Sequence, residues 1–237
     1  MSATSPDRRE FADGAALAIA FSAWTADLLR AAIEARGAAL LIVSGGTTPL
    51  RYFQALSNQP LDWSRVAITL ADERRVPDDS PRSNARLVRE SLLGNLAATA
   101  QFAPLADSRL PADKELAAAS ARIARLPLPA DLVVLGMGDD GHTASWFPNA
   151  DGLAEAIDPA ARALVQPISA PGAAEPRLTL TGRVILRARK IALQIEGADK
   201  LATLAKAFED GPTEAMPIRA VLRQATDRLT IFSAARS

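Results

Sequence analysis

The chain has 237 residues, of which 49% are hydrophobic, and it carries 27 basic and 27 acidic side chains. It can therefore build a sizeable core, and its balanced charge argues against broad binding to nucleic acid or an anionic membrane. The lack of cysteine excludes disulfides and thiol catalysis, and with a single histidine it disfavours a zinc site. We expect a cytoplasmic, monomeric protein that needs no metal or cofactor.

The N-terminal segment has two competing interpretations. Arg8 and Arg9 precede an apolar run over residues 15–23, as in a twin-arginine or secretory signal. Glu10 and Asp13 interrupt that pattern, and the run is about half of the roughly 20 residues that a membrane span needs. We favour an alanine-rich helix over residues 13–36 that packs on a sheet and ends at Gly37.

The next segment combines a strand, a glycine-rich loop and a helix. Residues 38–43 form an apolar run of strand length, and the loop that follows leads into a helical pattern in which Thr48 is the expected N-cap and Pro49 the first helical residue. Such an arrangement can gather free backbone N–H groups around an anion. An ordinary strand-to-helix turn is the alternative. The loop residues are Ser44, Gly45, Gly46, Thr47 and Thr48.

A second strand, over residues 66–70, is followed at once by four charged side chains, Asp72 to Arg75. Charges are costly to bury, so this segment is either a solvated turn or part of a site. Ser83 is expected to cap a helix that runs to residue 93, and another helix is expected over residues 112–125, between two prolines.

The most informative stretch begins at Asp131. Residues 132–135 are continuously apolar, as in a strand buried on both faces of a parallel sheet. Gly136 and Gly138 then allow unusual backbone conformations or a close approach of a ligand. The turn continues through Asp140 to His142, the single histidine of the chain. In an open α/β sheet, ligands bind beyond the carboxyl end of a strand, which is where this turn lies.

The remaining elements complete an alternating pattern. We expect short strands at residues 164–166 and 177–181 with a loop at 170–176 between them, a strand at 190–196, helices at 199–209 and 217–224, and a last strand at 228–232. Strands that alternate with helices predict an α/β fold, a doubly wound, mostly parallel, Rossmann-like sheet with helices on both faces. No change in composition marks a boundary, so we interpret residues 1–237 as one domain.

The three polar segments should share one crevice, because each follows a strand and the carboxyl ends of parallel strands meet at one edge. A model imidazole titrates near ~6.5, which suits general base catalysis at neutral pH. Asp140 could orient the ring of His142 or share its proton. The sequence has no Gly-x-Ser-x-Gly nucleophile motif, so the histidine points to activated water or to proton transfer at a carbon acid.

Several motifs occur together in a fixed order. They are Ser44-Gly45-Gly46-Thr47-Thr48-Pro49, Asp72-Glu73-Arg74-Arg75-Val76-Pro77 leading to Ser83-Asn84, Gly136-Met137-Gly138-Asp139-Asp140-Gly141-His142-Thr143-Ala144-Ser145 with Phe147-Pro148, Arg177-Leu178-Thr179-Leu180-Thr181, and Gly197-Ala198-Asp199-Lys200. On these motifs the chain resembles the bacterial 6-phosphogluconolactonases of the sugar-phosphate isomerase-like superfamily, which also includes glucosamine-6-phosphate deaminase.

The resemblance implies hydrolysis of 6-phospho-D-glucono-1,5-lactone to 6-phospho-D-gluconate, the second step of the oxidative pentose phosphate pathway. His142 then corresponds to the general base that activates water, Asp140 to its neighbour, and Arg74 to a residue that steadies the substrate or the oxyanion. The implied substrate and phosphate site comprises Ser44, Gly45, Gly46, Thr47, Thr48, Asp72, Arg177 and Lys200. A sugar phosphate is the implied ligand, with no nucleic-acid or membrane partner.

Two alternatives stay open at this point. In the deaminase branch the histidine turn continues to a glutamate where this chain has Phe147, so a carboxylate needed for that chemistry is missing. A sugar-phosphate sensor of a transcription regulator would normally carry a helix-turn-helix, and the segment before the first strand holds one helix. Trp146 stands where a smaller apolar residue is expected, and sequence does not decide whether Arg74 or Arg75 enters the site.

Overall fold

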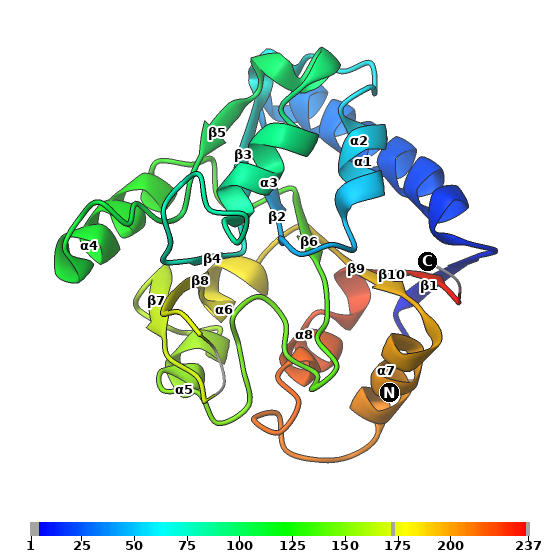
Figure 1. The fold of residues 1–237 in the computed structure, drawn as a ribbon. Helices are drawn as coiled ribbons and strands as arrows, with labels where there is room; N and C mark the ends of the chain where they lie inside the picture. The colour runs from blue at the N-terminus through cyan, green and yellow to red at the C-terminus, as the bar shows by residue number, and fades with distance from the viewer. Residues whose placement is uncertain (1–4, 172–173, 236–237) are drawn as a thin grey trace.

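The computed structural model describes residues 5–171 and 174–235 of the chain. Its main sheet has seven parallel strands in the order β1-β10-β9-β6-β2-β3-β5 (Figure 1). The strands are β1 (Asp7–Phe11), β2 (Ala39–Val43), β3 (Val66–Leu70), β5 (Gln101–Ala103), β6 (Leu132–Leu135), β9 (Lys190–Glu196) and β10 (Leu229–Ala234). The predicted α/β class and the mostly parallel sheet are confirmed.

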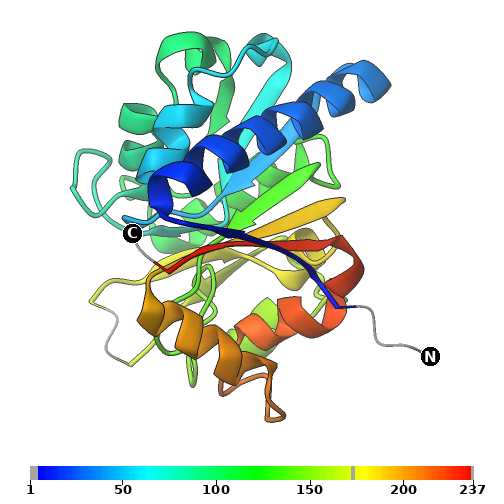
Figure 2. The same ribbon diagram turned by 90° about the vertical axis from the view of Figure 1, so that its right-hand side faces the viewer.

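Helices cover both faces of this sheet. Figure 2 shows α1 (Gly14–Arg36) and α2 (Leu50–Leu56) above it, and α7 (Ala198–Phe208) and α8 (Ile218–Gln224) below it. All five residues of β2 and all four of β6 are therefore buried, as their continuous apolar sequences predict. The other helices are α3 (Asn84–Ser91), α4 (Ala112–Ala124), α5 (Leu153–Ile157) and α6 (Gly182–Ile185), with 3₁₀ turns η1 (Trp63–Arg65), η2 (Asn95–Thr99) and η3 (Thr226–Arg228).

The apolar N-terminal run lies inside α1, as the helical interpretation predicts. Asp13 caps the helix by accepting from two backbone N–H groups, and Gly37 ends it in the left-handed conformation. By length and composition α1 could cross a membrane, the one such helix among the described residues. In the fold its face with Leu17, Phe21 and Leu29 is fully buried.

A second, three-stranded antiparallel sheet crosses the carboxyl edge of the first, in the order β4-β8-β7. Its strands are β4 (Asp72–Arg74), β7 (Val165–Ile168) and β8 (Arg177–Leu180). Of the two alternatives for the segment after β3, the solvated turn is wrong, because Asp72 pairs with Thr179 and Arg74 with Arg177 in a strand. The two predicted strands near residues 164–166 and 177–181 exist as β7 and β8, but β7 pairs with β8 and β8 with β4, and neither joins the main sheet.

Other differences concern the ends of elements. Strands β1 and β5 were not predicted, since the first is a short, charged edge strand and the second has three residues. Thr48 does not cap α2: Pro49 occupies the N-cap position, and no side chain bonds to the first turn. Helix α3 ends at Ser91, two residues before the predicted end at residue 93. Gly172 and Ala173 of the predicted loop lie outside the described residues.

Candidate functional site

A cavity of about 350 Å³ opens where the two sheets meet. The loops after β2 and β6 form one side, and residues from β4, α3, β8, β9 and α7 complete it. The predicted site residues that line this cavity are Ser44, Gly45, Gly46, Thr47, Thr48, Asp72, Arg74, His142, Arg177 and Lys200. The structure thus brings together groups that are up to 156 positions apart in the sequence (200 − 44).

His142 and Asp140 form a hydrogen-bonded pair at the cavity wall. Oδ1 of Asp140 lies 2.5 Å from Nδ1 of His142 and 3.0 Å from its backbone nitrogen. An ionised carboxylate only accepts hydrogen bonds, so in the neutral imidazole Nδ1 carries the proton and Nε2 is left as the acceptor. Partial burial acts to raise the pKa of Asp140, but the hydrogen bonds from His142 outweigh it, and the pKa lies below its ordinary value. Asp140 itself does not line the cavity.

The glycine before this pair is required by close packing. A Cβ on Gly138 would overlap the imidazole of His142 and approach the carboxylate of Asp140. The backbone N–H of Gly138 donates to the carbonyl of His142 at 2.9 Å, which closes the turn. The second glycine of the Gly-x-Gly motif therefore serves the histidine, because its missing side chain makes room for the ring.

The loop after β2 is suited to an anion. Ser44 is anchored to β6 through its backbone N–H and the carbonyl of Val134, at 3.0 Å. Within residues 5–171 and 174–235, no hydrogen bond occupies the backbone N–H of the four residues that follow, Gly45 to Thr48. Unpaired N–H groups that converge at the start of a helix favour a negatively charged ligand.

The small sheet supplies charged side chains to the opposite wall. Asp72 is buried and accepts from the hydroxyl of Ser145 at 2.5 Å, and it lies 3.8 Å from the guanidinium of Arg177. Arg74 lines the cavity and donates to Oδ1 of Asn84 at 2.6 Å. Arg75 instead pairs with Glu115 at 2.5 Å and does not line the cavity. Between the two neighbouring arginines, Arg74 is the one at the site.

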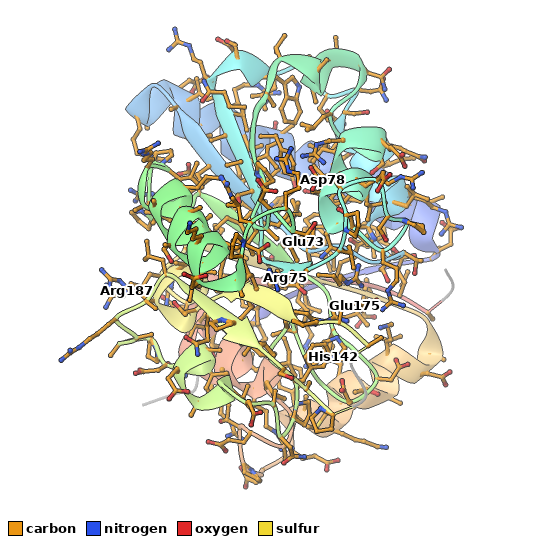
Figure 3. All side chains as sticks on the ribbon, turned by 60° about the vertical axis from the view of Figure 1, so that its left-hand side comes forward. Glu73, Arg75, Asp78, His142, Glu175 and Arg187 are labelled. Carbon is orange, nitrogen blue, oxygen red and sulfur yellow. The ribbon has the colours of Figure 1, made fainter. Side chains whose placement is uncertain are left out.

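Glu73 holds this wall in place from behind. Its carboxylate accepts from the backbone N–H groups of Arg74, Asn84 and Ala85 at 2.7–2.8 Å, and so ties β4 to the start of α3. Burial raises the pKa of Glu73 above its ordinary value, although these backbone hydrogen bonds oppose the shift. Figure 3 shows Glu73 and Arg75 close together, above His142.

Two further cations complete the polar lining. Burial lowers the pKa of Arg177, against the influence of the nearby carboxylate of Asp72, but a guanidinium stays protonated. Nζ of Lys200 donates to the carbonyl of Met137 at 2.5 Å and lies 3.7 Å from Asp139. Each cation therefore has a polar neighbour from another element at the cavity: Asp72 for Arg177, and Met137 and Asp139 for Lys200.

Unpaired polar atoms point to a ligand in this cavity. In the part of the chain that the structure describes, four buried side-chain atoms have no hydrogen-bond partner, and all belong to residues that line it: Ser44 Oγ, Arg74 Nε, Arg177 Nε and Gln194 Oε1. Leaving a buried polar group unpaired costs about 1–3 kcal/mol. Their gathering around one cavity indicates that the protein keeps these groups for a polar ligand.

Some residues of the site were not predicted. Asn84 was seen only as part of a motif, and its side chain joins Arg74 to the backbone carbonyl of Asp72. Gln194 lies in β9, where one amide inside an apolar strand is the signal that could have identified it. Its Nε2 donates to the carbonyl of Thr48 at 3.3 Å and to Glu196 at 2.7 Å, so its Oε1 is the free end.

The sequence of residues 12–231 matches the family model described as "Glucosamine-6-phosphate isomerases/6-phosphogluconolactonase". The chain belongs to this family. It is 50% identical to the 6-phosphogluconolactonase of Mesorhizobium japonicum, covering 94% of this chain and 92% of that one, and 48% identical to that of Rhizobium meliloti, covering 94% and 96%. The crystal structure of a 6-phosphogluconolactonase from Shewanella baltica superposes with a TM-score of 0.93 at 42% identity, covering 97% and 98% of the two chains.

Membership of the family confirms the resemblance and the expectation of an enzyme. The similarity covers nearly the whole chain, and the range that the family model matches, residues 12–231, includes every residue that lines the cavity. It does not by itself assign roles to single residues, so these follow from the chemistry of the site.

Proposed function

We propose that the protein hydrolyses 6-phospho-D-glucono-1,5-lactone to 6-phospho-D-gluconate, with His142 as the general base. The observation that carries this proposal is the His142–Asp140 pair at the wall of a cavity that is also lined by a loop with unpaired backbone N–H groups and by arginines. The names of the relatives support the substrate class, since each is called a 6-phosphogluconolactonase.

The reaction needs no group beyond those at the cavity. Nε2 of His142 accepts a proton from water as the water oxygen bonds to the lactone carbonyl carbon, and the carbonyl oxygen becomes an oxyanion. The bond to the ring oxygen then breaks, and the imidazolium returns its proton to that oxygen to give the open-chain hydroxyl. Asp140 keeps the proton of Nδ1 in place throughout and stabilises the imidazolium.

The remaining residues of the site bind the substrate and stabilise the oxyanion. The loop from Ser44 to Thr48, with Arg177 and Lys200, takes the phosphate, whose binding energy holds the ring against His142. Arg74 faces the carbonyl and stabilises the oxyanion, because a fixed donor acts most strongly where charge develops. Asp72 orients Arg177 and accepts from a sugar hydroxyl.

The aminosugar deaminase is the second member named in the family description, and we rank it lower. Phe147 occupies the position at which that branch has a glutamate, and its ring lies against His142. A sensor without catalysis is disfavoured by the ordered His142–Asp140 pair, which a binding protein would not need. The single-domain, monomeric and cytoplasmic assignments stay predictions.

The decisive experiment measures turnover of freshly generated 6-phosphogluconolactone, corrected for spontaneous hydrolysis, by the wild type and His142→Ala. General base catalysis contributes about 10²–10⁴-fold, so we expect kcat to fall by at least about 10²-fold with little change in KM. Wild-type turnover no faster than the spontaneous rate would refute the proposal. Ammonia release from glucosamine 6-phosphate would support the deaminase instead.

A lactone is an activated ester, so its hydrolysis by this site should not depend on a metal ion. We expect kcat to be unchanged after exhaustive treatment with a chelator. Loss of activity that returns on adding a divalent cation would contradict the proposed mechanism.

A further inference from the structure

Phe147 lies in a segment that is held rigidly although it is part of a loop. The two residues before it are fully buried. The hydroxyl of Ser145 donates to Asp72, and the indole N–H of Trp146 donates to the carbonyl of Leu180 at 3.1 Å. The backbone N–H of Phe147 donates to the carbonyl of Ser145 at 3.1 Å. The position of Phe147 is thus set by contacts with the small sheet as well as by the turn that carries His142, where the backbone N–H of Trp146 donates to the carbonyl of Thr143 at 2.9 Å.

The ring of Phe147 contacts two residues of the site. Its centroid lies 4.3 Å from the centroid of the His142 imidazole, with the planes inclined by 38°. The guanidinium carbon of Arg177 lies 5.0 Å from the same phenyl centroid. The distance to Arg177 falls within the roughly 6 Å of a favourable cation–π contact, and the distance to His142 is slightly shorter than the roughly 4.5–7 Å of most aromatic pairs, so the two rings are in direct contact. One apolar side chain therefore touches the general base of the proposed mechanism and a cation of the phosphate site.

This contact adds what the other restraints on His142 lack. Asp140 fixes one ring nitrogen. The missing Cβ of Gly138 leaves space for the ring but does not restrain its orientation. A single hydrogen bond leaves the imidazole free to tilt about the Nδ1–Oδ1 direction. The phenyl ring removes that freedom, and its π electrons favour the positive charge that the imidazole gains when it accepts a proton.

Arg177 needs the same support for a different reason. Its Nε is buried without a hydrogen-bond partner, and Asp72 is 3.8 Å away, so polar contacts alone hold the guanidinium loosely. A guanidinium is planar and only weakly hydrated, and it packs well on an aromatic face. Phe147 supplies that face and fixes the guanidinium relative to His142.

We propose that Phe147 is a positioning residue that sets the placement of His142 relative to Arg177, and so aligns the scissile carbonyl with the base once the phosphate is bound. This inference rests on the proposed function for its kinetic consequence. Phe147 does not itself line the cavity, but this inference gives it a role in both kcat and KM.

The test compares Phe147→Leu with Phe147→Tyr, which keeps the ring. Phe208→Leu is the matched control, because that phenyl also lies under an arginine, Arg8, at 4.5 Å, but among the described residues it forms no aromatic or cation–π contact with His142 or Arg177. His142 is the single histidine, so its imidazole signals in NMR spectra of histidine-labelled protein need no further assignment. Turnover and KM are measured on the same samples.

We expect Phe147→Leu to shift the imidazole signals, since the ring current is lost, and to mix the two neutral tautomers. It should lower kcat by about tenfold or more and raise KM, because a small displacement of a catalytic group is costly. Phe147→Tyr should restore all three quantities, and Phe208→Leu should leave them unchanged. If the leucine variant does not fold, Phe147→Met serves in its place.

Two results would overturn the inference. Unchanged imidazole signals in Phe147→Leu would show that the ring does not hold His142. Shifted signals with wild-type kcat and KM would show a contact without a role in positioning. A wild type that lacks lactonase activity would refute the proposed function instead, while the NMR comparison would still decide whether Phe147 orders the imidazole.

Discussion

The two sheets contribute to the site in different ways. The central strands β2 and β6 of the seven-stranded sheet are apolar, and they end in turns that present backbone N–H groups and the His142–Asp140 pair. The three-stranded sheet places charged side chains directly from its strands, namely Asp72 and Arg74 from β4 and Arg177 from β8. In the proposed reaction the first sheet supplies the proton transfer and part of the phosphate site. The second supplies the arginines that stabilise the charges of the oxyanion and the phosphate.

This difference follows from burial. A parallel strand covered by helices on both faces cannot hold a charge in its middle, so chemistry is confined to the residues beyond its end. The strands of the small sheet lie at the cavity and can offer alternate side chains to it. Substitutions in the His142–Asp140 pair of the first region should therefore act mainly on kcat, and substitution of Arg177 in the second mainly on KM.

Asp140→Asn should give the largest effect. An amide can donate to Nδ1 and stabilise the wrong tautomer of His142, so we expect kcat to fall by about 10²-fold or more with KM nearly unchanged. Steady-state kinetics measures the fall in kcat. Asp210→Asn, which removes an exposed carboxylate, is the control. A variant with wild-type kcat would show that the pair does not act as a unit.

Arg177→Gln should mainly raise KM. A hydrogen bond to a charged group contributes about 1.5–3 kcal/mol, so we expect KM to rise by about ten- to a hundredfold with a smaller change in kcat. Arg187→Gln is the matched control: in Figure 3 its side chain points outward, away from His142. A large fall in kcat at constant KM would break the division between the sheets.

Ser83→Ala tests the support behind the small sheet. Ser83 caps α3 by accepting from the backbone N–H of Arg86 at 3.1 Å, and loss of such a cap costs about 1 kcal/mol. Urea unfolding should show this loss in the free energy of unfolding, while Ser64→Ala, an exposed serine, should show almost none. An unchanged stability would mean that Glu73 alone anchors the start of α3.

Glu73 should give the smallest effect, a change in pH dependence. Because burial raises its pKa in the folded state above 4.5, its contribution to stability is complete below that pH and is lost as pH rises through the folded pKa. The free energy of unfolding of the wild type relative to Glu73→Gln should therefore fall as pH rises above about 4.5. Glu34→Gln, which is exposed, should show a flat difference, and a flat difference for Glu73→Gln would contradict the raised pKa.

The sequence alone determined the central strands of the main sheet and the residues at their carboxyl ends. Apolar runs that end in glycine-rich or charged segments identified β2, β3, β6 and β9, because a strand covered on both faces must be continuously apolar. The same logic placed Ser44 to Thr48 and His142 in one crevice, since the carboxyl ends of parallel strands meet at one edge.

Tertiary structure alone decided how the second wall is built. A three-residue strand such as β4 has no periodicity to read, and its pairing with β8, which begins more than 100 positions later, is a long-range contact that local pattern cannot reveal. That pairing turns Arg74 toward the cavity, whereas Arg75 pairs with Glu115 outside it. The contacts of Phe147 with His142 and Arg177, and the free Oε1 of Gln194, likewise exist only once distant segments pack, because packing and not local sequence sets which side chains meet.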